Sequence, residues 1–343
     1  MYLGPQLRET TLKFQNILVL NFGQLGDVVL SLPALNALRQ HFPDSHIAVV
    51  TGKIADQVIK LSGLADEVIM VDRVELRDGS KLRSIGKILQ FTRAIRRRPI
   101  DLVIDLHSLS ETNILAFLST AKLRLLANRE SRSLDRLSNF RPKPPAEDKS
   151  KHLSDRYLDV LRPLGIENTD RQVRLTASGA DLEYVRHRFF DNAGRRTVGL
   201  FPGAGHPSRC WSLENFAALA SMFESDGLRP AVFLGPEEAG MKEQVTALFP
   251  NATVVIDGLS IPQFIAAASM LAAFVTNDTG PMHLAACAGT SILLLIDERA
   301  PTTYLPLTDR IEIVRNRTID SISVEDVYQA AKSLLTKFPP TGE

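Results

Sequence analysis

The sequence of 343 residues predicts an α/β protein with two doubly wound parallel sheets, one in each half of the chain. Short apolar runs alternate with helical patterns through most of the sequence, as repeated strand–helix units require. The apolar runs are continuous, which is typical of strands covered by helices on both faces. A break in this alternation near the middle predicts two domains, 1–172 and 173–343.

The first half should contain five strands with helices between them. Continuous apolar residues predict strands at 17–21, 46–51, 67–71, 101–106 and 123–127. Helical patterns, two of them closed by a proline, are found at 35–41, 54–61, 80–97 and 111–119. Residues 128–150 are rich in Arg, Ser and Pro, so they predict an exposed loop near the domain boundary, which is expected at 165–180.

The second half resumes the alternation after a helix at 153–164 and a short strand at 172–175. Further strands are expected at 197–201, 229–234, 253–257, 273–277 and 291–296. Further helices are expected at 180–192, 213–225, 237–248, 261–271, 281–288 and 324–337. The last helix has two candidate positions, on its own domain or back on the N-terminal domain.

The composition is that of a globular protein, with 44% hydrophobic and 23% charged residues. No apolar run reaches the roughly 18 residues of a membrane helix, and residues 1–15 lack the apolar core of a signal peptide. The two cysteines, Cys210 and Cys287, are too few for a disulfide framework or a cysteine-rich zinc site. A cytoplasmic location is therefore expected.

Charge is unevenly distributed, although the net charge of the chain is only +1. Residues 1–180 carry 27 Lys and Arg against 20 Asp and Glu, whereas residues 181–343 carry 13 against 19. A basic half favours an anionic partner, such as nucleic acid, an acidic glycan or an anionic membrane surface; a solvated basic helix is the alternative. Phe91 is the one aromatic residue in the basic run 73–98, so binding to nucleic acid is not expected.

The loop after the first predicted strand, 21–27, is the first of three that can carry chemistry. Gly23 and Gly26 allow the backbone to turn tightly and to approach a ligand. Asp27 begins the next helix. It is either a first-turn carboxylate favoured by the helix dipole or a general base held on a rigid strand-to-helix turn.

The second loop, 201–211, lies between a predicted strand and a predicted helix. Its glycine-rich turn, which includes Ala204 and Gly205, presents backbone N–H groups, and Arg209 adds a positive charge. This combination suits a diphosphate, although Arg209 is alternatively a surface ion-pair residue. Trp211 is expected to be a packing anchor.

The third loop, 277–283, leads into another helix. Asp278 or Thr279 can cap this helix, and Pro281 suits its first turn. The helix N-terminus forms an anion site, and His283 can point back at the same anion. The alternative is a capped helix with a hydrogen-bonded histidine.

The stretch 17–35, ILVLNFGQLGDVVLSLPAL, resembles the opening of glycosyltransferase family 9, the ADP-heptose:lipopolysaccharide heptosyltransferases. The resemblance continues through PGA at 202–204, RCW at 209–211 and NDTGPMHLAA at 277–286, in the order expected of the family. It implies a GT-B fold, in which two Rossmann-like domains face a central cleft. The N-terminal domain would bind the acceptor, and the C-terminal domain would bind the nucleotide sugar.

The same resemblance implies roles for residues within the motifs. Asp27 would be the general base, with Gly23 and Gly26 in the loop around it on the acceptor side. The residues that bind the diphosphate and the sugar of the donor would be Arg209, Asp278, Thr279, Gly280, His283, Ala204 and Gly205. Glu237 would contact the nucleoside. The family more often has Lys at the position of Arg209, which keeps the charge and changes the geometry.

The implied activity is inverting transfer of heptose from ADP-heptose to an inner-core lipopolysaccharide acceptor, without a metal ion or other cofactor. Cations and a helix N-terminus would stabilise the departing diphosphate. The basic N-terminal domain suits an anionic lipid-linked glycan at the cytoplasmic face of the inner membrane. Candidates for binding this acceptor are Arg73, Arg77, His107 and Arg129.

Two alternatives remain open: a relative within the family that uses another nucleotide sugar or acceptor, and a non-catalytic nucleotide-binding protein of the same fold. An NAD-dependent oxidoreductase is disfavoured, because the first strand–helix unit lacks both a GxGxxG sequence and an acidic residue to bind the ribose.

Overall fold

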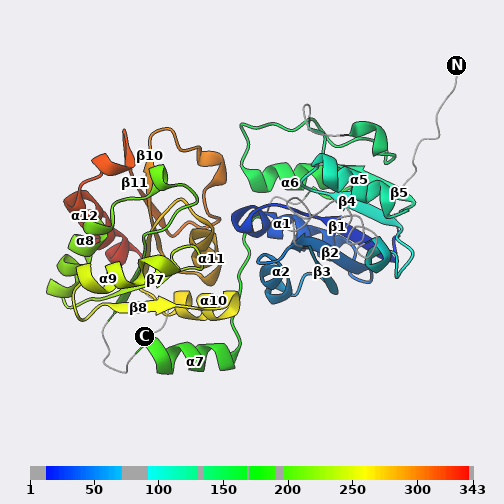
Figure 1. Cartoon of the computed structure of the whole chain (residues 1–343). Coiled ribbons are helices and arrows are strands. Elements are labelled where there is room, and N and C mark those ends of the chain that lie inside the picture. The colour runs from blue at the N-terminus through cyan, green and yellow to red at the C-terminus, as the bar shows by residue number, and fades with distance from the viewer. Residues whose placement is uncertain (1–12, 72–91, 130–133, 168–169, 191–195, 340–343) are drawn as a thin grey trace, which may run out of the picture. The chain divides into compact units, whose positions relative to one another are not determined.

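The structure is a computed structural model of the chain (Figure 1). It describes residues 13–71, 92–129, 134–167, 170–190 and 196–339. Its contacts divide the chain into two compact units, of which the first comprises residues 1–23 and 33–170. The second comprises residues 24–32 and 171–343. The start of the first helix therefore groups with the C-terminal half of the chain.

Five parallel strands form the sheet of the first unit, in the order β3-β2-β1-β4-β5. They are β1 (Asn16–Leu20), β2 (His46–Gly52), β3 (Glu67–Val71), β4 (Leu102–Asp105) and β5 (Leu123–Leu126). The helical segments described around them are α1 (Leu25–His41), α2 (Asp56–Ser62), α5 (Ser110–Leu118), η1 (Asp135–Leu137), α6 (Leu153–Leu161) and η2 (Arg162–Leu164). The strand order reverses between β1 and β4, and ligands of such sheets bind outside the carboxyl ends of the strands at this point.

Six parallel strands form the sheet of the second unit, in the order β11-β10-β9-β6-β7-β8. They are β6 (Thr197–Phe201), β7 (Arg229–Leu234), β8 (Val254–Asp257), β9 (Ala273–Asn277), β10 (Ile292–Asp297) and β11 (Ile311–Asn316). The α-helices described in this unit are α7 (Gly179–Phe189), α8 (Leu213–Ser225), α9 (Lys242–Leu248), α10 (Ile261–Ser269), α11 (Gly280–Ala288) and α12 (Val324–Lys337). Short 3-10 turns are η3 (Pro207–Arg209), η4 (Ala239–Met241), η5 (Thr302–Tyr304) and η6 (Ile319–Ser321). The order reverses between β6 and β9.

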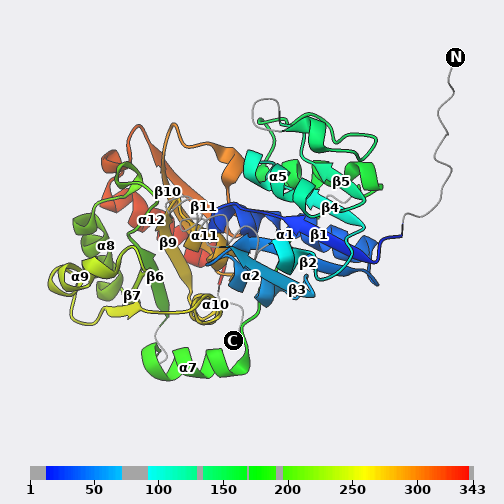
Figure 2. The same cartoon turned by 45° about the vertical axis from the view of Figure 1, so that its right-hand side comes forward.

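Both faces of the second sheet are covered, which explains its continuous apolar strands. In Figures 1 and 2 the strands lie between α8, α9 and α12 on one side and α10 and α11 on the other. The strands β6, β9 and β10 are almost entirely buried. The buried side chains of α12, including Val327 and Leu334, pack in the core that α8 shares with the sheet. The last helix thus finds its packing partners in the second unit, whereas the sequence left a position on the first domain open.

Most elements lie where the sequence predicts them, and three regions differ. Residues 172–175 are not a strand, because the N–H of Leu175 bonds to the carbonyl of Cys287 at the end of α11 and not to a neighbouring strand. The segment 128–150 is not simply an exposed loop: it buries Phe140 and pairs Asn128 with Ala146 in an isolated parallel bridge.

The third difference is a strand that the sequence analysis missed, the edge strand β11. Two other predictions differ in part. The helix expected at 237–248 begins as the 3-10 turn η4 before α9, and most of the helix expected at 80–97 lies outside the described residues. Among the helices that the structure describes, none is long and apolar enough to cross a bilayer.

Candidate active site

The loops that follow β6 and β9 share the carboxyl edge of the second sheet. The two strands pair in parallel, with Phe201 opposite Thr276, so the residues that follow them emerge side by side. These are the second and third loops singled out in the sequence. The structure therefore brings together two loops that lie about 70 residues apart in the chain, as expected for neighbouring parallel strands.

A buried amide joins the two loops. Asn277, the last residue of β9, is fully buried, and its Nδ2 donates to the carbonyl oxygens of Pro202 (2.9 Å) and Gly203 (3.3 Å). Its Oδ1 accepts from the N–H of Trp211 (3.0 Å). One side chain thus holds both ends of the loop between β6 and α8.

Trp211 is a packing anchor, as the sequence predicts. Its ring is 1% exposed and meets the ring of Phe216 edge-on, and its Nε1–H donates to the carbonyl of Ile322 (2.9 Å). A buried indole N–H needs such an acceptor. The loop is thereby fixed at its carboxyl end, next to η3, which carries Arg209.

Arg209 and Asp278 form an ion pair at the mouth of these loops. Their Nη1 and Oδ2 atoms are 3.5 Å apart, and the Arg209 side chain is 56% exposed. Burial raises the pKa of the Asp278 carboxyl, and the neighbouring guanidinium opposes that shift. The exposed cation can therefore turn to an incoming anion at small cost, because an exposed ion pair contributes little.

The third loop ends at the N-terminus of α11. Thr279 occupies the N-cap position, but its side chain makes no capping hydrogen bond, contrary to one of the two caps expected from the sequence. Pro281 lies in the first turn, as predicted, and His283 is 5% exposed. A helix end that lacks a side-chain cap retains the partial positive charge that favours anions.

The first turn of α1 lies against this helix end, and both belong to the second unit. A Cβ added at Gly26 would lie 2.9 Å from Cδ2 of His283, and one added at Gly280 would lie 3.0 Å from Cδ2 of Leu25. A real Cβ essentially never comes as close as the first distance, and the second is tighter than most real contacts, so glycine at these two positions permits the contact between the turns. The absence of a side chain at Gly26 and Gly280 lets the first turns of α1 and α11 lie close together.

Asp27 is the third residue of α1. Its Oδ2 accepts a hydrogen bond from the N–H of Gln24 (3.0 Å), so the carboxylate satisfies one of the N–H groups at the helix start. This hydrogen bond orients the carboxylate. Gly23 also has a defined position, since its N–H donates to Oδ1 of Asn21 (3.0 Å).

A third loop of this edge, after β7, carries two adjacent glutamates with different environments. Glu237 is exposed, whereas Glu238 is buried and accepts from the N–H of Gly235 (3.1 Å). The Glu238 carboxylate lies against Gly203, where an added Cβ would overlap it. Burial, followed by the neighbouring charge of Glu237, raises the pKa of Glu238. The buried carboxylate that faces the loop after β6 is therefore that of Glu238, whereas Glu237, predicted to contact the nucleoside, is exposed beside it.

The sequence analysis missed Asn277 and Glu238 as contributors to this edge. Asn277 was part of a recognised loop, but sequence spacing does not reveal its bonds to residues 66 to 75 positions away. The sequence held one signal for a buried glutamate, namely the glycines Gly203 and Gly235 in two neighbouring loops. Both lack a side chain where the carboxylate of Glu238 lies. Nothing in the sequence indicates which of the two adjacent glutamates is buried there.

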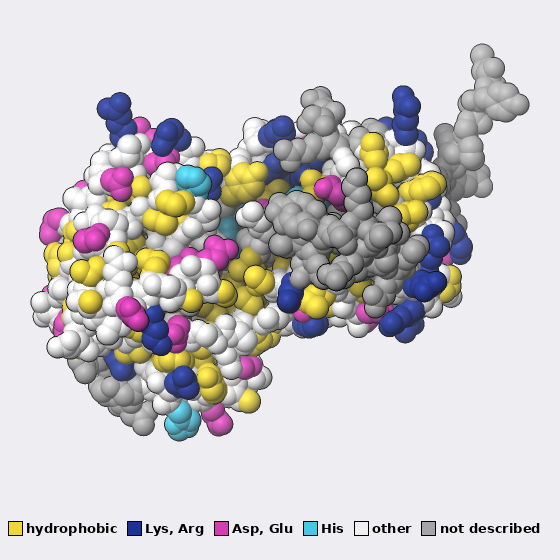
Figure 3. All heavy atoms as spheres, in the orientation of Figure 1, with side chains coloured by type: hydrophobic (Ala, Val, Ile, Leu, Met, Phe, Trp, Pro, Cys, Tyr) yellow, Lys and Arg dark blue, Asp and Glu magenta, His cyan; other side chains and the backbone are white. Residues whose placement is uncertain are grey.

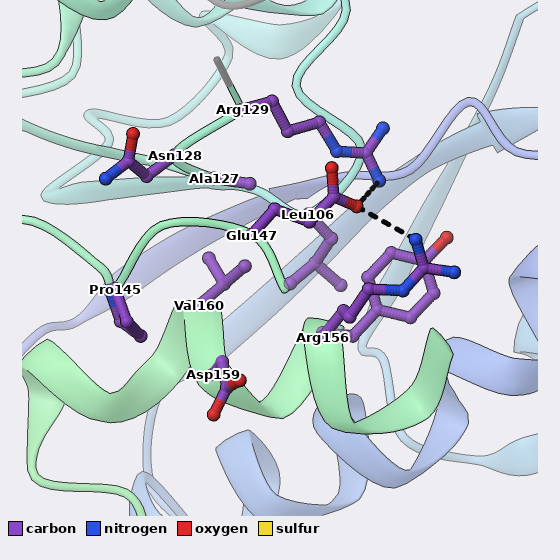
Figure 4. Close-up of a pocket in the computed structure, with 10 residues that line it drawn as sticks. Leu106, Ala127, Asn128, Arg129, Pro145, Glu147, Arg156, Asp159 and Val160 are labelled. Carbon is purple, nitrogen blue, oxygen red and sulfur yellow. Dashed lines mark hydrogen bonds and ion pairs between the residues drawn. The ribbon is translucent and has the colours of Figure 1, made fainter. Parts of the chain in front are cut away.

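A second polar site lies in the first unit, at the carboxyl ends of β4 and β5 (Figure 4). In this pocket, Nη2 of Arg129 and Nη1 of Arg156 each lie 3.1 Å from the same oxygen, Oε1 of Glu147. All three side chains are largely buried. Among the described residues that line the pocket, the other acid is Asp159, which already pairs with Lys151 (2.7 Å) and is therefore neutralised locally. Two guanidinium groups thus face one carboxylate, and the pocket favours an anion.

Residues far apart in the chain build this pocket. Glu147 reaches it because its N–H donates to the carbonyl of Asn128 (2.9 Å), next to Arg129, whereas Arg156 comes from α6. Arg129 was a candidate from the sequence, and Arg156 was not. Two other candidates, Arg73 and Arg77, lie outside the described residues.

A buried carboxylate supports the neighbouring turn. Asp105, the last residue of β4, is fully buried and accepts hydrogen bonds from the N–H groups of His107 (3.1 Å) and Ser108 (2.7 Å) and from Nδ2 of Asn113 (2.7 Å). Ser108 adopts a left-handed conformation with φ of 47°, which these bonds help to hold. Burial raises the pKa of Asp105 to about 6, although the hydrogen bonds oppose the shift. The fourth acceptor-side candidate, His107, thus sits on a turn that this carboxylate holds.

Comparison with known proteins agrees with this architecture. The sequence model of Glycosyltransferase family 9 (heptosyltransferase) matches residues 88–332. Lipopolysaccharide heptosyltransferase 3 of Escherichia coli K12 is 23% identical over 343 residues, which covers 93% of this chain and 97% of the relative. Lipopolysaccharide core heptosyltransferase OpsX of Haemophilus influenzae is 19% identical over 303 residues, which covers 88% of this chain and 84% of the relative.

Solved structures of the same family share the fold. A glycosyl transferase family 9 structure from Veillonella parvula aligns with a TM-score of 0.84 and 25% identity, over 96% of this chain and 99% of that chain. The E. coli heptosyltransferase WaaC with ADP aligns with a TM-score of 0.76 and 18% identity, over 93% and 99%. The two parallel-sheet units are those of the GT-B fold. Since the family match also spans well over half of the sequence, the chain belongs to glycosyltransferase family 9, a family of heptosyltransferase enzymes.

Proposed function

We propose that this enzyme transfers heptose from ADP-heptose to an inner-core lipopolysaccharide acceptor, with inversion at the anomeric carbon and Asp27 as the general base. The observation that carries the proposal is the close approach of Gly26 to His283. It brings the turn that holds Asp27 beside a helix end suited to a diphosphate. A base and a site for the leaving group are the two requirements of an inverting transfer.

On the donor side, the diphosphate would meet the N-terminus of α11 at Thr279 and Gly280, with His283 and Arg209 as further donors. Backbone groups at Ala204 and Gly205 and the carboxylate of Asp278 would complete the contacts to the diphosphate and the sugar. Glu238 is a better candidate than Glu237 for the nucleoside, since it is the buried acid at this edge. ADP-heptose is favoured because WaaC has been solved with ADP and with ADP-2-deoxy-2-fluoro heptose.

In the reaction, Asp27 would accept the proton of the acceptor hydroxyl as that oxygen forms its bond to the anomeric carbon. The bond from this carbon to the diphosphate breaks on the opposite face, and its electron pair leaves with ADP. Positive groups fixed at the helix end would stabilise the developing charge without rearranging during the reaction. No metal ion or cofactor enters this scheme.

On the acceptor side, the pocket of Arg129 and Arg156 would bind a phosphate or carboxylate of an anionic lipid-linked glycan. Its support is the excess of guanidinium over carboxylate at a sheet edge where ligands bind. Such an acceptor would locate the enzyme at the cytoplasmic face of the inner membrane. Nucleic acid is not proposed as a partner.

The test compares wild type with Asp27→Asn. An asparagine Oδ1 still accepts from the N–H of Gln24, so the helix start is kept while the ability to take a proton is lost. Turnover should fall by about a hundredfold to ten-thousandfold, the usual contribution of a general base, with ADP affinity unchanged. Mass spectrometry of the acceptor glycan, after incubation with ADP-heptose and with other nucleotide sugars, would identify the donor.

A matched control is Asp326→Asn, because Asp326 is another first-turn carboxylate and accepts a hydrogen bond from the hydroxyl of Ser323, the N-cap of α12. It should leave turnover unchanged. Undiminished turnover of Asp27→Asn would remove Asp27 from the mechanism, and transfer only from a donor other than ADP-heptose would revise the substrate.

A further inference from the structure

Large hydrophobic side chains are exposed together on the first unit. Ile114 and Phe117 of α5 are 47% and 52% exposed, and Leu134 is 41% exposed. Ile114 and Phe117 are three residues apart, so they lie on the same helix face. The N–H of Leu134 donates to Oδ1 of Asn113 (2.7 Å), which puts Leu134 beside this helix. We call these three residues the α5 patch.

Basic side chains surround the α5 patch. The guanidinium of Arg124 lies 5.6 Å from the ring centroid of Phe117, and Arg96 donates to the carbonyl of Leu118 at the end of α5. The Lys122 side chain is 74% exposed. In Figure 3, hydrophobic side chains gather over the position of α5, with Lys and Arg side chains at their edges.

Acidic residues of the neighbourhood do not cancel this basic edge. Asp101 pairs with Lys122 (2.8 Å) and lowers its effective charge, and Glu111 lies on the exposed face of α5, one turn before Ile114. Arg96 and Arg124 remain beside Phe117, whereas η1, which packs on α5, carries one acid and one base in sequence, Asp135 and Arg136, and adds no net charge. Among the residues that the structure describes here, the balance at the Phe117 end of the helix is therefore positive.

Single exposed hydrophobic residues are common and need no explanation, but an apolar cluster with a cationic edge is typical of proteins that lie on anionic membranes. The cationic edge is complementary to the negative surface of such a membrane. We propose that the α5 patch docks on an anionic bilayer, with Ile114, Phe117 and Leu134 among the lipid headgroups and Arg96, Lys122 and Arg124 at the level of the phosphates. The proposal rests on this surface alone and not on the transfer reaction.

The test is flotation with vesicles, without donor or acceptor. One set contains phosphatidylcholine alone, and the other contains equal parts of phosphatidylglycerol and phosphatidylcholine. Wild type should bind the anionic set, and binding should weaken with salt, because screening shortens the reach of the charges. The double variant Ile114→Ser/Phe117→Ser should lose about tenfold or more in affinity. Removing a cation, as in Arg96→Gln, should cost about fivefold.

Matched controls come from the second unit. Leu248 is also 41% exposed, and the Arg299 side chain is 80% exposed, so Leu248→Ser and Arg299→Gln remove the same chemistry elsewhere. Both should bind vesicles as wild type does. Thermal unfolding and turnover with a water-soluble acceptor fragment should be unchanged in all variants, which separates a docking defect from misfolding or from a failure of the proposed reaction.

Three results would overturn the proposal. These are absence of binding to the anionic vesicles, equal binding to both vesicle sets, and patch variants that bind as well as wild type. A change confined to self-association, measured by sedimentation, would instead assign the patch to a second copy of the chain and would also overturn it.

Discussion

Asp105 and Asn277 occupy corresponding places in the two sheets. Asp105 ends β4, which pairs with β1, the first strand of its sheet; Asn277 ends β9, which pairs with β6, the first strand of the other. Both side chains are fully buried at the point where the strand order reverses. Asp105 bonds to the turn that follows it, whereas Asn277 bonds across to the neighbouring loop.

The difference teaches how one topology supports two kinds of site. The amide of Asn277 both donates and accepts, so it fixes a loop without adding charge, and the positive potential there comes from a helix end and Arg209. Asp105 only accepts, and it is ionisable. Asp105, together with Glu147 and its two arginines, makes the carboxyl edge of the first sheet ionic, and we expect this edge to respond to pH. This edge is called the first edge, and the carboxyl edge of the other sheet the second edge. Substitutions that exchange or remove these features test the difference between the two sheets.

Replacing Asn277 by Asp should destabilise the second unit by roughly 3–5 kcal/mol at neutral pH. The new carboxylate can still accept from the N–H of Trp211, but it would face the carbonyl oxygens of Pro202 and Gly203 without a donor. Folding then favours the protonated acid, so the pKa of the introduced group rises, and stability should be recovered as the pH is lowered. Urea unfolding followed by the fluorescence of Trp211, the single tryptophan, reports on this loop.

Asn277→Ala provides the reference, since it removes the same bonds without adding a charge. It should cost about 2 kcal/mol, with no new dependence on pH. Asn316→Ala is the matched control: its Nδ2 donates to the carbonyl of Ser321 in an exposed setting, and its loss should be small. If the Asp and Ala variants unfolded alike at every pH, the amide would not be acting as a donor.

The first edge should respond to pH through Asp105. Its folded pKa of about 6 lies above its ordinary value of 3.8, so the folded state binds the proton more tightly than the unfolded state does. The contribution of Asp105 to the free energy of unfolding is therefore most favourable below pH 3.8 and is lost as the pH rises to about 6. Two pKa units correspond to about 3 kcal/mol.

Asp105→Asn should remove this dependence. The measurement is the free energy of unfolding of wild type minus that of the variant, from about pH 4 to pH 7, followed by circular dichroism because the tryptophan lies in the other unit. The difference should decline with rising pH and level off above about 6. A flat difference would mean that Asp105 titrates normally in the folded protein.

Glu147→Gln tests the ionic part of the first edge. Removing the shared carboxylate charge leaves two guanidinium groups facing each other, so the first unit should lose about 2 kcal/mol, less than for a fully buried pair because all three side chains keep some exposure. A higher phosphate concentration should restore part of this stability. Asp257→Asn, which breaks an exposed pair with Lys242, should change little. Equal effects of the two variants would reduce the pocket to a surface ion pair.

The sequence predicted the fold well where burial alone decides it. The strands 197–201, 229–234 and 273–277 have the predicted bounds because both of their faces are covered, which makes them continuous apolar runs. β11 was missed because it is a half-buried edge strand that includes Glu312 and Arg315. The segment 172–175, which was predicted as a strand, also mixes polar and apolar residues. Its backbone bonds to the end of α11 and not to a strand, and no local sequence pattern reveals that.

The sequence indicates candidate site residues where one loop holds them, but not where the fold assembles them from distant segments. Arg209, Asp278 and His283 belong to local motifs, and the structure brings their loops to one edge. Arg156 and Glu147 meet through an irregular segment, so the pocket of the first unit has no sequence signature. Local motifs therefore indicate the loops at the carboxyl edge of the second sheet, whereas the pocket of Arg129, Glu147 and Arg156 is visible only in the structure.

The smallest expected effect concerns the glycine loop of the second edge. Gly203→Ala would add a Cβ that overlaps the Glu238 carboxylate, so either the loop or the acid must shift, at a cost of about 1–2 kcal/mol. Gly179→Ala, at the start of α7, is the matched control, because no atom lies within 4 Å of its added Cβ and the residue lies outside the proposed site. ADP affinity measured by calorimetry should fall for the first variant and change much less for the second. Glu238→Gln keeps the size of the side chain, so a loss of ADP affinity in that variant would trace the effect to the carboxylate itself. If Gly203→Ala and Glu238→Gln both bound ADP as wild type does, the nucleoside would bind elsewhere.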